Sequence, residues 1–284
     1  MPAIGFLLHP GDESALDDAV AAAERCGYSS WTAVTDPAMA LSQHAADTRL
    51  LVTVGGDGTF LLGARIAAIH DIPVLGVNRG RLGFLTDVQM ETLPAAIEEF
   101  ASGEAVMERR AMLQATIAGA PPLLDAIALN DVVVKSEGVT VARLHVDADG
   151  ELLGDFDADG IVVATATGST AYALSAGGPP VDPRVRATVV VPLAPHAVIT
   201  RALILPETTR LRITVARGRA IAAADGQSPV SMHEGDTVDV SPGRELQFVR
   251  LAGSPPFVQR LREKLRFGTP LKGIGRGSSV DPDA

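Results

Sequence analysis

Apolar runs alternate with helically spaced segments over the first hundred residues. The runs are short and continuous, which is typical of strands covered on both faces of a sheet. The strands that we expect are residues 3–9, 30–34, 50–54 and 72–77. The helices that we expect are residues 14–26, 60–69 and 91–100. Strands that alternate with helices indicate a parallel sheet in an α/β domain, whose ligands lie at the carboxyl ends of the strands.

The pattern changes near Val106, where helical spacing disappears and β-branched runs recur between turn signals such as Asp149-Gly150. One short helix, residues 169–175, interrupts the runs. The strands that we expect here are residues 113–118, 126–134, 139–146, 160–166, 187–191, 201–205, 211–216 and 237–240. Their spacing predicts an all-β second domain.

These patterns divide the chain into four parts. Residues 1–105 would form the α/β domain and residues 106–252 the all-β domain. A terminal helix from Phe257 to Arg266 lies within residues 253–271, which we expect to pack back on the first domain. Residues 272–284 are rich in Gly, Ser, Asp and Pro, a composition typical of disorder.

A glycine-rich loop, Gly55-Gly56-Asp57-Gly58-Thr59, follows the predicted strand 50–54. Glycines let phosphate oxygens approach main-chain N–H groups at the N-terminus of the next helix. Asp57 would then act as a general base for a hydroxyl, as a Mg²⁺ contact, or as both. We expect Thr59 to cap the helix that begins at residue 60. The alternative is an ordinary tight turn with a solvated aspartate.

Composition narrows the class of protein. The chain has 284 residues, a net charge of −10 and only three lysines, which argues against a nucleic-acid partner. It has no Gly-x-x-x-x-Gly-Lys-Ser/Thr motif, so it is not a P-loop ATPase. No apolar stretch is long enough to span a membrane, and the N-terminus lacks the basic start of a signal peptide. A single cysteine, Cys26, fits a reducing cytoplasm.

Polar residues follow the end of one predicted strand and lie inside another. Asn78 begins a loop that reaches Phe84, which would either stack on a nucleotide or join the core. Asn130 and Asp131 lie inside an apolar run and suit the two hydroxyls of a ribose, with a β-bulge as the alternative.

A third polar cluster, Asp155, Asp157 and Asp159, resembles the start of a calcium loop but lacks its final acid. We interpret Asp155 and Asp157 as a polar strand face.

Small and hydroxyl-bearing residues crowd the segment from Thr165 to Pro179. Such a segment would pack against a flat ligand and offer donors from Thr170, Tyr172 and Ser175, or it would be a tight helix–sheet contact. Asp225-Gly226-Gln227 is interpreted as a hairpin turn. His196 receives no catalytic role.

Taken in order, these motifs resemble the NAD kinase family over residues 3–268. The blocks that carry the resemblance are Gly55–Thr59, Asn78–Leu85, Asn130-Asp131, Asp159-Gly160, Thr167–Pro179, Pro195-His196 and Asp225–Gln227. The first block is shared with lipid kinases, whereas the block 167–179 is similar to NAD kinases in particular.

The resemblance implies an α/β Rossmann-like N-terminal domain and a β-sandwich C-terminal domain. It implies transfer of a phosphoryl group from ATP or polyphosphate, with a divalent metal such as Mg²⁺, to the 2′-hydroxyl of the adenosine ribose of NAD. NADP would be the product, and the protein would be a homodimer or homotetramer.

The resemblance also assigns site residues. Asp57 takes the position of the base, and Gly58, Asn130 and Asp131 take positions that contact NAD. The remaining matches to substrate-binding positions are Arg143, Asp159, Thr170, Ala171, Tyr172, Ser175, Ala194 and Gln227. Phe84 is a substrate-binding candidate from its own loop. Gly55, Gly56 and Thr59 would complete the phosphate-binding loop.

Three positions depart from the family pattern. Ala166 replaces a usual proline, Ala164 a frequent serine, and Asp157 an arginine of many members. The change at Asp157 places a negative charge beside the expected substrate site. Asp157 is the only hint of one alternative, a non-catalytic NAD(P)-binding sensor. The shared first block leaves a second alternative, a lipid kinase of the same superfamily.

Overall fold

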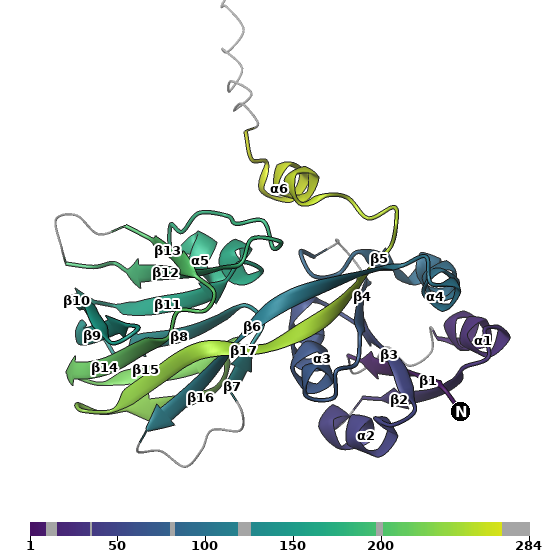
Figure 1. The fold of residues 1–284 in the computed structure, drawn as a ribbon, viewed down its shortest axis with the longest axis horizontal. Coiled ribbons are helices and arrows are strands. Elements are labelled where there is room, and N and C mark those ends of the chain that lie inside the picture. The colour runs from purple at the N-terminus through teal and green to yellow at the C-terminus, as the bar shows by residue number, and fades with distance from the viewer. Residues whose placement is uncertain (10–15, 35, 80–82, 119–125, 197–200, 269–284) are drawn as a thin grey trace, which may run out of the picture. The chain divides into compact units, whose positions relative to one another are not determined.

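The computed structural model describes residues 1–9, 16–34, 36–79, 83–118, 126–196 and 201–268 (Figure 1). The chain divides into two compact units, Met1–Ser254 and Pro255–Ala284. In the second unit the helix α6 spans Phe257–Leu265. The expected packing of residues 253–271 on the first domain stays a prediction, and residues 272–284 lie outside the described part of the chain.

The first unit begins with a parallel sheet in the order β4-β3-β1-β2. The strands are β1 (Ala3–Leu8), β2 (Ser29–Ala33), β3 (Thr48–Val54), β4 (Val74–Asn78) and the short β5 (Val88–Gln89). The helices are α1 (Asp17–Arg25), α2 (Pro37–His44), α3 (Asp57–Ile69) and α4 (Leu93–Ser102), with the 3₁₀ turn η2 (Met90–Thr92) before α4. Apolar clusters place α1 and α4 on one face of the sheet and α2 and α3 on the other.

The rest of this unit is a two-sheet β structure. The antiparallel sheet runs in the order β13-β12-β11-β8-β15-β16. Its strands are β8 (Asp131–Ser136), β11 (Gly160–Thr165), β12 (Ala187–Leu193), β13 (Leu203–Pro206), β15 (Ala220–Ala224) and β16 (Gln227–Met232). The facing strands are β6 (Val106–Ala118), β7 (Ala126–Ala128), β9 (Ala142–Ala148), β10 (Glu151–Ala158), β14 (Leu211–Arg217) and β17 (Thr237–Arg250). The 3₁₀ turn η3 (Gly168–Thr170) and α5 (Tyr172–Ser175) follow β11.

The strand β17 joins the two halves. Its first part pairs with β14, it pairs with β6 over nearly its whole length, and Phe248 near its end pairs with Val74 of β4. One sheet of 11 strands therefore continues from the α/β part into the β part. The predicted fold class, an α/β N-terminal part followed by an all-β C-terminal part, is confirmed.

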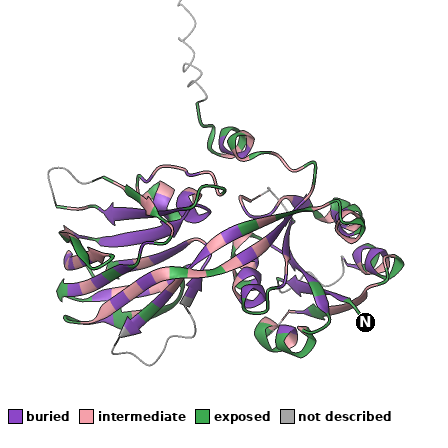
Figure 2. Cartoon of the chain, in the orientation of Figure 1, coloured by how far each residue is buried: buried purple, intermediate pink, exposed green. Residues whose placement is uncertain are grey.

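Among the described residues, four apolar clusters hold this unit together, and Figure 2 shows buried residues in purple. One of the four packs Ala173 of α5 against β11 and β12. Another lies between the two β sheets, and a third lies between the parallel sheet and α1 with α4. The fourth contains Phe60 of α3, Leu129 from the β part and Phe248 of β17. This fourth cluster fixes α3 against the β part and so decides which loops meet at the site.

Some predicted boundaries were wrong. The helix α3 begins at Asp57 and its N-cap is Gly56, so Thr59 lies inside the first turn and does not cap it. The run 126–134 is not one strand, because the chain bends at Leu129 and Asn130. The helix α2 and the strands β15 and β16 were not predicted, although the turn between these two strands was.

Two further observations concern membranes and turns. No helix in the described ranges is long and apolar enough to cross a bilayer. The predicted turn at Asp149-Gly150 is confirmed, since both residues have positive φ, 52° and 85°, between β9 and β10.

Candidate functional site

Asp57 lies in the first turn of α3, immediately after the buried strand β3. Gly55 has a φ of 156°, and a Cβ there would lie 2.5 Å from the Thr59 hydroxyl oxygen. Nothing lies within 4 Å of a Cβ built on Gly56 or Gly58, so the loop is open beside the acid. The N-terminus of a helix offers free N–H groups and a partial positive charge, which favour a phosphate.

A second loop packs against the Asp57 carboxylate. The main-chain N–H of Leu85 donates to Asp57 Oδ1 at 3.4 Å. A Cβ on Gly83 would lie 2.1 Å from the same oxygen, so a larger residue there would displace the carboxylate. The Thr86 hydroxyl oxygen accepts from Gly83 N at 3.0 Å and from Asn78 Nδ2 at 3.1 Å, which ties this loop to the end of β4.

The bend at Leu129 and Asn130 forms the second side of the site. Thr165, the last residue of β11, donates its hydroxyl to the Leu129 carbonyl at 2.6 Å and its N–H to the Asn130 carbonyl at 2.9 Å. The same hydroxyl accepts from Gly168 N at 3.0 Å. A Cβ on Gly168 would lie 2.0 Å from the Asn130 carbonyl oxygen. The bend and the turn η3 are therefore in direct contact.

The segment after β11 is held by hydrogen bonds within the protein, including one from the Thr170 hydroxyl to Thr167 O at 3.3 Å. Ser169 is fully buried, donates its hydroxyl to Ala166 O at 2.7 Å and accepts from Val181 N at 2.8 Å. Thr170 is half-buried, whereas Tyr172 and Ser175 are exposed. This arrangement agrees with both alternatives for the segment, because its inner face packs tightly and its outer face carries hydroxyls.

A row of ring and ion contacts connects α3 with this segment. The Phe60 and Phe248 rings lie 5.2 Å apart, and the Arg110 guanidinium lies 4.8 Å from the Phe248 centroid. Arg110 is buried, pairs with Glu108 and donates to the Thr167 hydroxyl at 3.4 Å.

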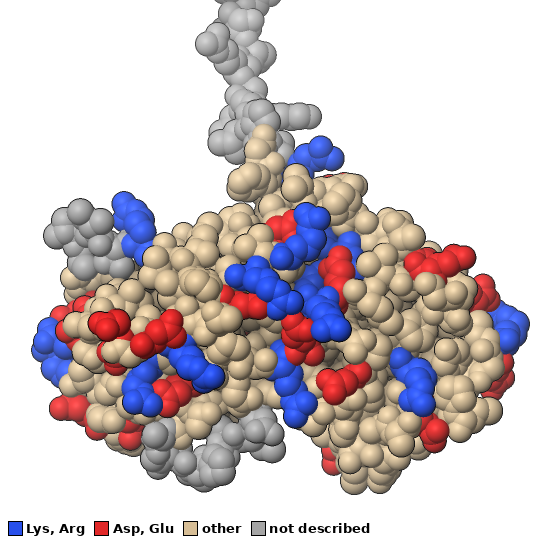
Figure 3. All heavy atoms as spheres, viewed as in Figure 1, with Lys and Arg blue, Asp and Glu red and all other residues tan. Residues whose placement is uncertain are grey.

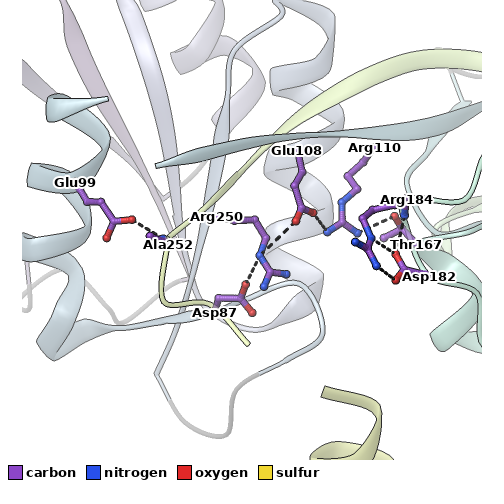
Figure 4. A network of polar contacts seen from close by, with 9 residues as sticks. All are labelled: Asp87, Glu99, Glu108, Arg110, Thr167, Asp182, Arg184, Arg250 and Ala252. Carbon is purple, nitrogen blue, oxygen red and sulfur yellow. Dashed lines mark hydrogen bonds and ion pairs between the residues drawn. The ribbon is translucent and has the colours of Figure 1, made fainter. Parts of the chain in front are cut away.

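The row continues through Glu108 and Arg250 to Asp87 (Figure 4), two residues after Leu85, whose N–H donates to Asp57. Arg250 lies 3.2 Å from Asp87 and 3.8 Å from Glu108. The network runs from a loop of the α/β part to the entrance of η3, and sequence analysis did not identify it.

Two carboxylates meet behind the bend. Asp131 and Asp225 are both buried, and the Asp225 carboxylate accepts from the N–H groups of Leu129, Asn130 and Asp131. Burial, and then the charge of Asp225, raises the pKa of Asp131 to about 7. Burial also raises the pKa of Asp225, while its three hydrogen bonds and the charge of Arg65 act against that rise. Sequence analysis identified this residue only as part of a turn.

A separate group of predicted substrate-site residues lies at the opposite end of β11: Asp159, Ala194 and Arg143. Asp159 is exposed, its N–H donates to Leu193 O at 2.9 Å, and Ala194 follows directly with a φ of 41°. Arg143 forms two hydrogen bonds to Asp157, at 3.0 and 2.6 Å, and Arg217 forms a third at 3.3 Å.

The negative charge at Asp157, which sequence analysis placed beside the substrate site, is therefore matched by two guanidinium groups. The hydrogen bonds from Arg143 hold the pKa of Asp157 below its usual range. Asp155 instead pairs with His145 at 2.9 Å, so Asp155 and Asp157 do form a polar strand face.

Arginines near the site are mostly neutralised by acids. Arg184 pairs with Asp182, and Arg186 pairs with both Glu207 and Glu245. Figure 3 shows the resulting mixture of acidic and basic side chains on one face.

The structure places the other expected contacts as follows. Gln227 is exposed and begins β16, directly after the Asp225-Gly226 turn, which confirms the predicted hairpin. Phe84 is half-buried beside Leu85.

Within the described ranges, no three His, Cys, Asp or Glu side chains gather as a metal site. A single carboxylate such as Asp57 still suits Mg²⁺, which proteins often hold through one or two carboxylates and substrate phosphates.

An acid at a glycine-lined helix N-terminus, in one unit with a hydroxyl-bearing segment and a buried acid pair, is the arrangement expected of a phosphotransferase that acts on a hydroxyl. Family models described as the ATP-NAD kinase N-terminal domain and the ATP-NAD kinase C-terminal domain match residues 8–105 and 129–251. The chain belongs to the NAD kinase family.

Known relatives agree with this assignment. An NAD kinase of Paraburkholderia phytofirmans is 39% identical over 238 residues, which cover 82% of this chain and 79% of the relative. The structure of yeast NADH kinase complexed with NADH matches with a TM-score of 0.81 at 26% identity, over 95% of this chain and 89% of that one.

An Archaeoglobus fulgidus NAD kinase in complex with ATP matches with a TM-score of 0.73 at 25% identity, over 88% of this chain and 94% of that one. The chain is thus an enzyme that phosphorylates NAD to NADP, and the lipid kinase and sensor alternatives are set aside.

Proposed function

We propose that Asp57 is the general base of this reaction and accepts the proton of the 2′-hydroxyl of the adenosine ribose of NAD. The observation that carries this proposal is the position of its carboxylate, in the first turn of α3 and hydrogen-bonded to Leu85 N. One carboxylate oxygen is fixed by that bond, and the side chain is only half-buried. The acid is therefore oriented and still accessible to a substrate.

The phosphoryl donor is ATP, in agreement with the ATP complex of the Archaeoglobus neighbour. Its phosphates would contact the N–H groups around Gly55, Gly56, Gly58 and Thr59, where the helix terminus favours negative charge. Transfer of this kind depends mainly on positioning and on stabilisation of charge. A Mg²⁺ ion held by the phosphates, with Asp57 as its protein contact, would neutralise charge on them.

The NAD site would lie along the bend and the segment that follows β11. The side chains of Asn130 and Asp131 would bind the hydroxyls of the ribose, because their own main-chain groups are already bonded inside the protein. Thr170, Ala171, Tyr172 and Ser175 would line the base-binding pocket, with Phe84 stacked nearby. Gln227 begins β16, directly after the turn whose Asp225 accepts hydrogen bonds from the bend.

Arg143, Asp159 and Ala194 require a different explanation, because they lie at the far end of β11. The six residues of this strand separate the two groups by roughly 17 Å. We propose that the enzyme is a homodimer or homotetramer in which this group contacts the nucleotide bound by a second copy.

Mixing two variants tests this arrangement. Asp57→Asn and Asp159→Ala proteins, each inactive alone, should regain partial activity when mixed. The mass in solution would be measured by light scattering.

One assay panel tests the reaction itself. NADP formation from NAD is measured with ATP and with polyphosphate, each with Mg²⁺ and with excess chelator. We expect activity with ATP and Mg²⁺ and loss of activity on chelation. Use of polyphosphate as a second donor stays an expectation from the family. The single cysteine is the basis for expecting a cytoplasmic enzyme.

A further inference from the structure

Asp225 is a buried carboxylate to which the proposed reaction gives no role. With Gly226 it forms the two-residue turn between β15 and β16, and their φ values are 49° and 68°. Aspartate is favoured in such turns because it tolerates positive φ. That tolerance does not require the side chain to be buried. Asp225 is instead only 9% exposed. Burial of a carboxylate is costly without partners, so its contacts indicate what it does.

The partners of Asp225 are three consecutive main-chain N–H groups. Its Oδ2 accepts from Leu129 at 2.9 Å, and its Oδ1 accepts from Asn130 at 2.8 Å and from Asp131 at 3.2 Å. In return, Asp225 N donates to Asp131 O at 2.8 Å. Successive N–H groups that converge on one anion form a rigid concave backbone feature.

The bend is thus fixed on two sides. Asp225 binds its N–H groups, and Thr165 binds the carbonyl groups of Leu129 and Asn130. The two side chains that these main-chain contacts do not engage are Asn130, which is half-buried, and Asp131, which is buried. Among the residues that the structure describes, none donates a hydrogen bond to the Asp131 carboxylate.

Asp225 is also linked to the helix that carries Asp57. The charge of Arg65, eight residues further along α3, acts on the Asp225 carboxylate. Arg65 lines a cavity of about 250 Å³ together with Ala224 and Gln227, the residues on either side of the turn. The carboxylate therefore lies where α3, the bend and the hairpin meet.

We propose that Asp225 is a positioning residue for NAD, which orients Asn130 and Asp131 by holding their main chain and does not touch the substrate. This inference rests on the proposed contacts of Asn130 and Asp131 with the ribose. Its physical basis is that an error of about 1 Å in a substrate contact can lower the rate roughly 100-fold.

Two variants separate geometry from charge. Asp225→Asn keeps an acceptor oxygen of the same shape, while Asp225→Ala leaves the three N–H groups without an acceptor. We expect the KM for NAD to rise roughly 10-fold in the first and roughly 100-fold in the second. The KM for ATP should stay within about threefold of the parent value, because the loop at Asp57 does not contact Asp225.

Asp149→Ala is the matched control. Asp149 begins the Asp149-Gly150 turn, has a φ of 52° and accepts an N–H of Arg210 at 2.9 Å, but its hairpin joins β9 and β10. It should leave both KM values unchanged, even if it lowers the melting temperature.

Hydrogen exchange of the amides at 129–131 tests the inference without turnover. Exchange in the unliganded Asp225 variants should be at least about 10-fold faster than in the parent and in Asp149→Ala. Unchanged exchange would overturn the positioning role whatever the kinetics. Faster exchange with an unchanged KM for NAD would show that Asn130 and Asp131 do not bind NAD. The proposed contacts and the inference would then fall together. If the alanine variant does not fold, Asp225→Asn gives the same readouts.

Discussion

The Asp57 carboxylate accepts a hydrogen bond from the main-chain N–H of Leu85, at 3.4 Å. This contact joins the first turn of α3 to the loop that follows β4, and it orients the acid that we assign as the base. Asp57→Asn keeps the shape and the contact but cannot accept a proton. We expect kcat to fall roughly 10²- to 10⁴-fold with the melting temperature nearly unchanged, measured by steady-state kinetics and thermal unfolding. Full activity of this variant would remove Asp57 from its role.

A methyl group at Gly83 should displace the same carboxylate. The added Cβ would lie 2.1 Å from Asp57 Oδ1 and 2.7 Å from the Thr86 hydroxyl. Gly83→Ala should therefore lower kcat roughly 10- to 100-fold. Gly253→Ala is the control, because nothing lies within 4 Å of its added Cβ. Equal activity of the two variants would contradict the placement of the loop against Asp57.

Removal of Asp157 should release two arginines beside Asp159. Its contacts with Arg143 and Arg217 are partly exposed, so Asp157→Ala should leave the melting temperature nearly unchanged. NADP should bind roughly two- to fivefold more tightly, because the released guanidinium groups attract its added phosphate. Calorimetric titration would measure this.

The control for that experiment is Asp239→Ala, which releases Arg212 from an equivalent two-bond pair on the same sheet. It should not change NADP binding. If both variants tighten binding equally, the effect is one of net charge and not of the Arg143 group.

Asp131 should make stability depend on pH. Its carboxyl has an ordinary pKa of 3.8 and a pKa of about 7 in the folded chain, chiefly through burial. Between pH 3.8 and about 7 the folded chain holds more protons than the unfolded chain. The free energy of unfolding therefore falls as the pH rises across this range, and the loss is complete above 7.

Asp131→Asn removes this ionisation. It should raise the melting temperature by roughly 5 °C more at pH 8 than at pH 5, in unliganded protein followed by circular dichroism. The same shift at both pH values would show that burial does not perturb this carboxyl.

Sequence patterns predicted the order of elements wherever apolar periodicity was strong. They did not predict α2, because Leu41 is its only buried residue and the apolar period is absent. The Asp36-Pro37 pair was the available signal, since Asp36 caps this helix through Met39 N. The strand β15 is mostly alanine, and Pro242-Gly243 obscured the length of β17, where the register shifts.

The site was predictable where one motif carries its own geometry, as at Gly55–Thr59. It was not predictable where partners are remote in sequence. Asp225 binds main-chain groups 94 to 96 residues away, and a turn motif contains no information about them. The same holds for Arg110, whose contact with Thr167 joins residues 57 positions apart.

The long strand β17 has a consequence for attempts to dissect the enzyme. It bonds to β6 along most of its length, and Phe248 near its end reaches Val74 of the parallel sheet. A fragment that stops at residue 105 would lose this neighbour and expose the edge of β4, whereas a fragment that starts at 106 would leave the end of β17 bare. We expect either fragment to aggregate instead of forming a soluble monomer. Heat or denaturant should unfold residues 1–254 in a single cooperative step.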